Sequence, residues 1–167
     1  SGTEQIGGEK AGILKFKGLT VINDPNAPDS VMDRVRSLRC KCLQYGHDYV
    51  DRAAGKLWNW QPRKTTAAWL TAENELPKPS LSGSHQVVNA AGVVAVLKLL
   101  GPQMAVSRRA LVEGLRAQSI RGRLEVYRGP PEVIVDVGHN VSAADRLVEF
   151  LEERPVTGRT LGVFSML

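Results

Sequence analysis

The segment Val133–Asn140, VIVDVGHN, constrains the fold of this chain more than any other. Its first five residues form an apolar run around one aspartate, the kind of strand that parallel sheets bury on both faces. Ser142, with Asp145 three residues later, is typical of a helix start. We therefore predict a buried strand, a short loop, and a helix that continues through AADRLVEFLEE with its leucines on one side.

A second apolar run, TLGVFSML, follows the turn RPVTGR, and we expect it to form a second buried strand. Strand, helix and strand together would make one βαβ unit. The texture of the sequence changes after Gln118, so we predict a domain boundary near Ser119–Arg123, between residues 1–120 and residues 121–167. Because the chain begins abruptly and ends on an apolar run, we also expect further polypeptide on both sides.

The first part of the chain predicts short strands and helices, which makes the fold class α/β. The β-branched run Leu19–Asn23 is typical of a strand. A turn cluster, NDPNAPDS, leads into a charged helix for which Asp29 or Ser30 is available as N-cap. CLQYGHDYV and KLWNW are typical of short strands, whereas Arg63–Gly83 is expected to be an irregular surface excursion.

Two helices are predicted next. The first, Gln86–Leu100, is almost wholly apolar and should be buried on several faces, with Asn89 as the one polar side chain in the first turns of its apolar stretch VVNAAGVVAVLKLL. Gly101–Pro102 ends it, and Ser107 is the expected cap of the second helix, RRALVEGLRAQ. The apolar stripe expected on the second helix consists of Ala110, Leu111 and Leu115.

Composition narrows the class of partner. The formal net charge of +5 suits anionic ligands such as nucleotides. The sequence has neither an arginine-rich tail nor a basic stripe interleaved with aromatic residues, so nucleic-acid binding is not favoured. No apolar run of about 18 residues predicts a membrane span, and no signal peptide is visible. Cys40 and Cys42, at C-x-C spacing, are expected to be two packed thiols, which fits the reducing cytoplasm.

Asp136 and His139 are the first candidates for chemistry. In open parallel sheets ligands bind beyond the carboxyl ends of the strands, where these side chains would lie beside a helix N-terminus. The alternative is a turn-capping aspartate and a surface histidine.

Arg123 could reach a phosphate in an interdomain cleft, or be a solvated arginine. Lys10, taken alone, fits a surface charge, and His47 and His85 lack partners at metal-ligand spacing.

The chain resembles the folylpolyglutamate synthase/dihydrofolate synthase family, which is related to the Mur ligases. The resemblance is carried by IGGEKAGILK, LSGSHQVVNAA, RGRLEVY and VIVDVGHNVSAADRLVEFL, which follow one another in the family's order, and by YGHDY between the first two. It implies the C-terminal portion of the family's ATP-binding domain in residues 1–120. It also implies the beginning of the Rossmann-like C-terminal domain in residues 121–167.

The resemblance assigns roles to three residues of the first part and the junction. Lys10 matches the lysine that the family carbamylates, whose added carboxylate helps to hold magnesium. Asn89 matches an asparagine on the nucleotide side of the cleft. Arg123 matches the arginine that contacts an ATP phosphate from the interdomain junction.

Three further roles follow for the strand–loop–helix segment. Asp136 matches an aspartate at the nucleotide, and His139 matches a histidine near the incoming glutamate. Asn140 completes the motif and is a candidate for substrate binding. Lys10 and His139 are thus the predicted catalytic residues.

The reaction implied is ATP-dependent addition of L-glutamate to dihydropteroate or folates through an acyl phosphate, with Mg²⁺ as cofactor. The expected protein is a cytoplasmic monomer that acts on small molecules. The alternatives are another Mur-type amide ligase of cell-wall synthesis and a non-enzymatic nucleotide-binding α/β module. HQVVNAA together with EKAGI favours the folate branch.

The sequence departs from the family at several points. It contains no G-x-x-x-x-G-K-[ST] phosphate loop. The pterin-binding residues, the histidine metal ligand before EKAGI and the end of the C-terminal domain are also missing. Val141 stands where the family usually has proline, and GGEK replaces a more usual Ala-x-Glu-Lys. We therefore expect the isolated chain to have no ligase activity.

Overall fold

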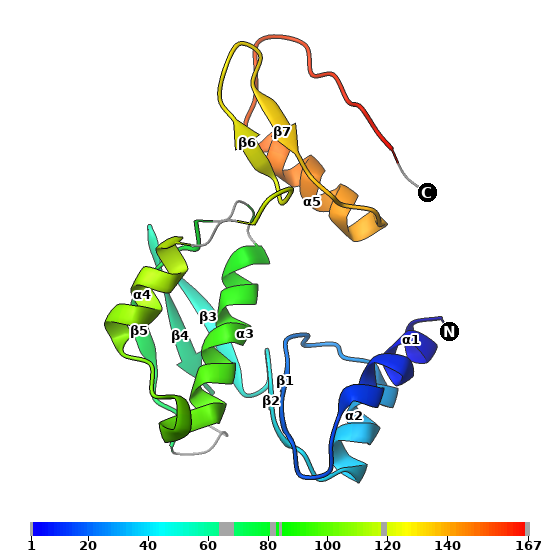
Figure 1. The fold of residues 1–167 in the computed structure, drawn as a ribbon, viewed down its shortest axis with the longest axis vertical. Coiled ribbons are helices and arrows are strands. Elements are labelled where there is room, and N and C mark those ends of the chain that lie inside the picture. The colour runs from blue at the N-terminus through cyan, green and yellow to red at the C-terminus, as the bar shows by residue number, and fades with distance from the viewer. Residues whose placement is uncertain (1, 64–68, 81–82, 84, 118–119, 166–167) are drawn as a thin grey trace.

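The computed structural model, which describes residues 2–63, 69–80, 83, 85–117 and 120–165, arranges its helices and strands in three groups (Figure 1). We call them the N-terminal group (residues 2–44), the central group (residues 49–117) and the C-terminal group (residues 120–165). In the described ranges, no helix is long and apolar enough to cross a membrane.

The N-terminal group pairs two helices with a small parallel sheet. Its elements are α1 (Gly2–Lys10), η1 (Ala11–Ile13), β1 (Leu19–Ile22), α2 (Asp29–Ser37) and β2 (Lys41–Gln44). β1 confirms the strand predicted from the β-branched run, and it pairs in parallel with β2. α1 approaches α2 closely at Gly7, because a Cβ there would lie 2.8 Å from Ser30 Oγ.

The start of α2 is capped from another helix. The N-cap is Pro28, and Asp29 and Ser30 are already helical, so the prediction that one of them caps the helix was wrong. The carboxylate of Glu4, in α1, accepts hydrogen bonds from their backbone N–H groups at 3.2 and 3.0 Å. These hydrogen bonds, chiefly those from Ser30, lower the pKa of the Glu4 carboxyl. A helix brought alongside by tertiary packing thus supplies the acceptor that proline lacks.

Glu4→Gln is expected to lower the thermal stability of the chain near neutral pH. The folded-state pKa of Glu4 is lowered, so its stabilising contribution is present above the unfolded pKa and is lost as the pH falls through the folded pKa. The difference in Tm between variant and wild type should therefore shrink on acidification. Thermal unfolding by circular dichroism at pH 7 and pH 3 measures it, with Glu9→Gln on the same helix as control. A difference in Tm that does not change with pH would exclude the cap.

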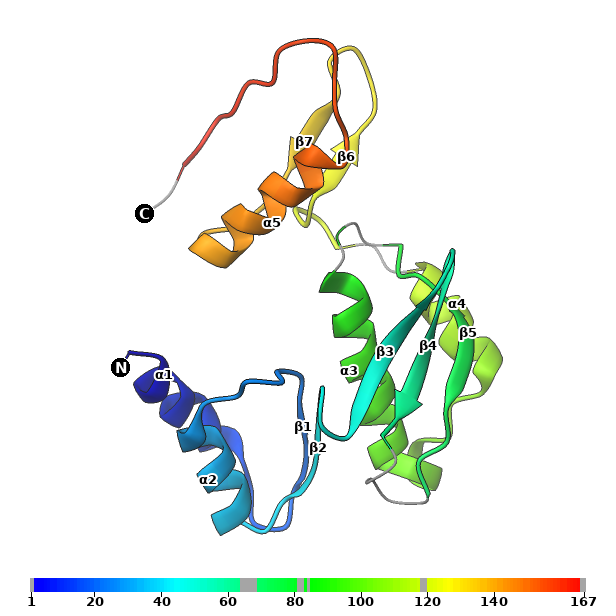
Figure 2. The same ribbon diagram turned by 180° about the vertical axis from the view of Figure 1, so that it is seen from behind.

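The central group contains the main core. Its elements are β3 (Tyr49–Ala54), β4 (Leu57–Pro62), β5 (Glu73–Pro77), α3 (His85–Leu100), η2 (Gly101–Met104) and α4 (Arg108–Ala117). The strands form an antiparallel sheet in the order β3-β4-β5. α3 packs against β3 and β4, and α4 lies along β5 (Figure 2).

Two tryptophans of β4 fix the sheet to its neighbours. The Trp60 side chain is fully buried, stacks on Tyr49 with ring centroids 5.4 Å apart, and donates from Nε1 to the Ala91 carbonyl of α3 at 3.1 Å. Trp58 Nε1 donates to the Pro77 carbonyl of β5 at 2.9 Å. Both indole N–H groups are therefore satisfied inside the core, as buried tryptophan requires.

β5 corrects a prediction. Residues 63–83 were expected to be irregular, but Glu73–Pro77 is a strand that pairs with β4 and buries Leu76 completely. Its sequence, ENELP, is too polar to indicate a strand, and its conformation is set by the partner strand. Residues 64–68 and 81–82 of the predicted excursion lie outside the described residues.

The helices of the central group largely follow prediction. α3 ends at Leu100 as expected, but one part of its surface is open, with Val93 49% and Val96 41% exposed. Ser107 Oγ accepts from the Ala110 N–H at 3.2 Å and so caps α4 as predicted. The packed side chains of α4 are Leu111, Val112 and Leu115. Ala110 is exposed, so its place in the stripe was wrong.

The C-terminal group is a hairpin with one helix, not the βαβ unit expected. β6 (Glu125–Tyr127) and β7 (Val133–Val135) pair antiparallel, and α5 (Val141–Glu152) buries Phe150. Val133 and Val135 are 48% and 40% exposed, so the strand is not buried on both faces. An apolar run does not specify the direction of its partner, and here the partner is the preceding strand.

The apolar run that ends the chain is not a strand over residues 160–165. Leu161, Val163 and Phe164 are 81%, 99% and 81% exposed. A strand needs a neighbour for its backbone N–H and C=O groups, and no described segment pairs with this one. Residues 166 and 167 of the predicted strand, and Ser119 of the predicted boundary, lie outside the described residues.

Candidate functional site

Asp136, directly after β7, joins two loops at the base of the C-terminal group. Its Oδ2 accepts a hydrogen bond from the Leu124 N–H at 2.9 Å, and its Oδ1 accepts from the Gly138 N–H at 2.6 Å. The Val137 N–H donates to the Gly122 carbonyl at 2.8 Å beside them. The loop that carries Arg123 is therefore held against the loop that carries the Asp-x-x-His segment.

Glycine is needed at the centre of this turn. A Cβ on Gly138 would lie 2.6 Å from Asp136 Oδ1 and 2.7 Å from the Ala143 Cβ, so any side chain there would displace the carboxylate or the helix. His139, next in the chain, is exposed, and its Nδ1 lies 3.2 Å from the Val137 carbonyl oxygen. The imidazole is thus held at the mouth of the turn with the rest of its ring open to solvent.

Asn140 is the N-cap of α5. Its Oδ1 accepts from the Ala143 N–H at 2.9 Å, so the helix begins two residues earlier than the Ser142/Asp145 signature predicted. The cap is an extended residue at the end of the motif, which leaves Ser142 within the first turn. A structural role for Asn140 is therefore observed, whereas its role toward substrate stays a prediction.

Asn140→Ala is expected to destabilise the C-terminal group by about 1 kcal/mol, the usual cost of removing an N-cap oxygen. Asn140→Asp should lose much less, because a carboxylate accepts the same hydrogen bond and favours the helix N-terminus. Urea denaturation followed by circular dichroism measures both variants. Equal loss in the two variants would show that the amide, not the capping oxygen, matters here.

A small cavity of about 30 Å³, which we call the junction cavity, lies where the C-terminal group meets the start of α3. It is lined by His85, Gln86, Arg123, Leu124, Asp136, Ala143 and Arg146. Two of the predicted site residues, Arg123 and Asp136, are therefore brought together. A space of this size takes about two water molecules or one small polar group rather than a whole ligand.

The first turn of α3 connects Asn89 to this cavity. Gln86 Oε1 accepts from Asn89 Nδ2 at 3.2 Å, and Gln86 Nε2 lies 3.0 Å from His85 Nε2, to which it can donate. Burial lowers the pKa of His85, and the neighbouring guanidinium of Arg146 lowers it further. The imidazole is therefore held neutral, which suits an acceptor for the Gln86 amide.

Three residues of this cavity were missed from the sequence. His85 was set aside because it lacks partners at metal-ligand spacing, and Gln86 and Arg146 were not considered. Gln86 stands three residues before Asn89 in one predicted helix, a spacing that places both side chains on one face and could have indicated it. Arg146 carried no such signal, because a cation inside an amphipathic helix is the ordinary solvated case.

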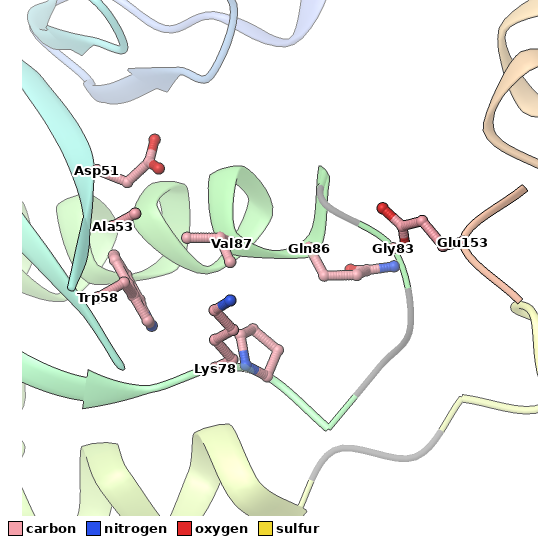
Figure 3. Close-up of a pocket in the computed structure, with 9 residues that line it drawn as sticks. Asp51, Ala53, Trp58, Lys78, Gly83, Gln86, Val87 and Glu153 are labelled. Carbon is pink, nitrogen blue, oxygen red and sulfur yellow. The ribbon is translucent and has the colours of Figure 1, made fainter. Parts of the chain in front are cut away.

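A larger cavity of about 370 Å³ lies on the other side of Gln86, between α3 and the sheet (Figure 3). Its apolar wall includes Ala53, Trp58, Pro79 and Val87, and its charged residues are Asp51, Lys78 and Glu153. Gln86 lines both cavities, so the first turn of α3 forms a common wall between them.

Lys10 is not part of this arrangement. It is the exposed last residue of α1, and Figure 1 shows α1 in the N-terminal group, apart from α3 and α5. Lys10 and His139 line neither cavity. Among the described residues, no three His, Cys, Asp or Glu side chains come together as a metal site.

Comparison with known proteins places the chain in one group. No protein-family model matches it. It is 31% identical to the dihydrofolate synthase/folylpolyglutamate synthase of Escherichia coli over 164 residues, which cover 98% of this chain and 36% of that protein. It is 30% identical to the protein of the same name from Haemophilus influenzae, covering 98% and 39%.

Solved structures agree with the curated relatives. The bifunctional folylpolyglutamate synthase/dihydrofolate synthase from Yersinia pestis, complexed with AMPPNP and Mn ion, matches with a TM-score of 0.76 and 30% identity, covering 90% of this chain and 33% of that one. Escherichia coli FolC in complex with DHPP and ADP matches with a TM-score of 0.78 and 26% identity, covering 93% and 35%.

The fold is therefore that of a Mur-ligase-type α/β protein, as the sequence predicted. The chain is a homologue of the dihydrofolate synthase/folylpolyglutamate synthase family over 98% of its length, which confirms the predicted resemblance. It spans little more than a third of the length of these curated relatives, 36% and 39%.

Proposed function

We propose that this chain is part of an ATP-dependent ligase that adds L-glutamate to dihydropteroate, to folates, or to both. The observation that carries the proposal is the junction cavity, in a chain homologous to synthases of this kind. Arg123 and Asp136 line that cavity with Gln86, which is hydrogen-bonded to Asn89. The three residues predicted to serve a nucleotide are thus connected through Gln86 across two groups of elements.

The position of that cavity supports the proposed division of the chain. Residues 1–120 would be the C-terminal portion of the ATP-binding domain, and residues 121–167 the beginning of the Rossmann-like C-terminal domain. The cavity lies between α3 of the first part and the loops of the second, where a bound nucleotide would touch both. Ligands in two-domain enzymes commonly bind at such an interface.

The proposed reaction has two steps. A phosphoryl group passes from ATP to a carboxylate of the pterin substrate, and the glutamate amine then displaces phosphate from the acyl phosphate. Arg123 would offset the charge of the transferred phosphoryl group. His139 is open to solvent beside the turn, as a residue that meets an incoming amino acid must be. The two loops joined by the Asp136 hydrogen bonds would hold Arg123 and His139 in place, and such positioning lowers the activation free energy of the reaction.

ATP and Mg²⁺ are the proposed cofactors, and a Mn ion accompanies AMPPNP in the related Yersinia pestis structure. The side chains described in this chain do not by themselves form a metal site. Lys10, if carbamylated, is the one metal ligand that we propose here, and we assign no step to the ion. The proposed partners are the small-molecule substrates alone, the proposed state is a monomer, and the proposed compartment is the cytoplasm.

The proposal is tested in a chimera in which this chain replaces the matching 164 residues of the Escherichia coli relative. We expect ADP release that requires dihydropteroate or a folate together with L-glutamate, and none with a muramyl-peptide substrate. His139→Ala should lower kcat at least a hundredfold, whereas Arg128→Gln, an exposed control in the same group, should not. A folded chimera without folate-dependent turnover would contradict the proposal, and the isolated chain is expected to be inactive.

A further inference from the structure

Arg146 is a cation that the proposed mechanism does not use. It lies in α5, and with Arg123 it lines the small junction cavity. The ion pairs of the described residues engage Arg36, Lys98, Arg108, Arg109 and Arg154, so neither cavity arginine is neutralised by one of them. Two exposed arginines from different elements thus line one space.

The other charged groups around the cavity cancel these cations only in part. Asp136 also lines the cavity, and its carboxylate keeps its negative charge while it accepts from the backbone N–H groups of Leu124 and Gly138. The negative charge of Glu149, one turn further along α5, acts to raise the pKa of His85, but Glu149 does not line the cavity. Two arginines and one carboxylate leave one positive charge in excess at the cavity, and phosphate oxygens match the planar donors of guanidinium.

We infer that Arg146 and Arg123 form a two-arginine clamp that holds a phosphate group at the junction cavity, with one phosphate oxygen in the 30 Å³ space. This inference rests on the proposed function in so far as the phosphate is that of a nucleotide. Arg146 is then a binding residue from α5, additional to those assigned above. Because the two arginines lie on separate segments, the bound phosphate also ties α5 to the loop before β6.

The clamp is tested on the 167-residue chain by titration with pyrophosphate and with ADP, followed by backbone amide chemical shifts at Arg123 and Gly138. Arg146→Gln is expected to weaken both ligands about tenfold, the effect of losing one charge-assisted hydrogen-bonding group. Arg146→Lys should lose less, because it keeps the charge and not the planar fork. Glu149→Gln should bind slightly more tightly, since it removes a nearby negative charge, and Arg128→Gln should match wild type.

The outcomes separate this inference from the proposed function. Wild-type affinity in Arg146→Gln, or no binding of pyrophosphate by the wild-type chain, overturns the clamp. If Arg123→Gln nevertheless weakens ADP, the proposed nucleotide site stands without Arg146. If Arg146→Gln weakens pyrophosphate but the chimera shows no folate-dependent turnover, the clamp stands and the ligase proposal fails. Far-ultraviolet circular dichroism of each variant excludes loss of folding as the cause.

Discussion

Trp60→Ala is expected to destabilise the chain by about 3–5 kcal/mol, the range typical of removing a buried aromatic side chain. The Trp60 side chain is fully buried, stacks on Tyr49 and holds the Ala91 carbonyl of α3 at 3.1 Å. Truncation therefore leaves a cavity and removes the hydrogen bond that joins β4 to α3. Domains are stable by only about 5–15 kcal/mol, so this loss is a large share of the total.

Trp60→Ala is also expected to affect ligand binding at the junction cavity. Tyr49, the stacking partner of Trp60, donates from its hydroxyl to Asn23 Oδ1 at 2.8 Å, and Asn23 Nδ2 donates to the Val88 carbonyl at 3.0 Å. α3 is thus held at two carbonyls on either side of Asn89. Loosening of this support should weaken ADP binding even under conditions where the variant is still folded.

Urea denaturation followed by circular dichroism measures the loss, with Trp69→Ala as the matched control. Trp69 is 44% exposed and lies with its ring centroid 4.3 Å from Lys41 Nζ, so its removal should cost about 0.5–1 kcal/mol. Trp60→Phe should fall between the two, because it keeps the stacking and loses the hydrogen bond. Similar midpoints for Trp60→Ala and Trp69→Ala would show that burial at β4 does not govern stability.

The central group could be predicted where sequence and environment agree. The apolar run before Leu100 has no alternative to a buried helix, and Ser107 caps the next one in the way its position indicates. β5 could not be predicted, because ENELP contains four residues that disfavour strands. It is a strand because β4 offers an edge to pair with, and that pairing arises from the tertiary structure and not from the local sequence.

The C-terminal group shows the opposite error. The apolar texture of β7 and of residues 160–165 predicted two parallel strands, yet one pairs antiparallel and the other has no strand partner among the described residues. Hydrophobicity indicates that a segment favours burial, but pairing direction depends on which neighbour is present. The family resemblance was the more reliable guide here, because it depends on the order of motifs and not on the conformation of one run.

The part of the candidate site that lies within single sequence motifs could be predicted. Asp136 and Arg123 were named from the sequence, and the structure brings them to one cavity. Whether they bind a nucleotide stays a prediction. Gln86 and Arg146 join them only because α3 and α5 approach one another, a contact between segments about sixty residues apart. No local pattern around Arg146 distinguishes it from a solvated arginine.

Asp136→Ala is expected to have the largest effect on the site. The carboxylate is the acceptor for two backbone N–H groups, those of Leu124 and Gly138, and it is partly buried. Its removal leaves both donors without their partner, and each such loss costs about 1–3 kcal/mol. The loop that carries Arg123 is then released from the loop that carries His139, so ADP affinity should fall more than tenfold as well.

Asp136→Asn separates the two consequences of this loss. One amide oxygen can still accept from one of the two N–H groups, whereas the amide nitrogen would face the other as a second donor. We therefore expect a stability between wild type and Asp136→Ala, measured by urea denaturation, and an ADP affinity closer to that of Asp136→Ala. Asp145→Ala, an exposed carboxylate on α5, is the control and should match wild type in both measurements. If Asp136→Ala behaved like Asp145→Ala, the two loops would be joined by their backbone alone, and the carboxylate would have to act directly on a ligand.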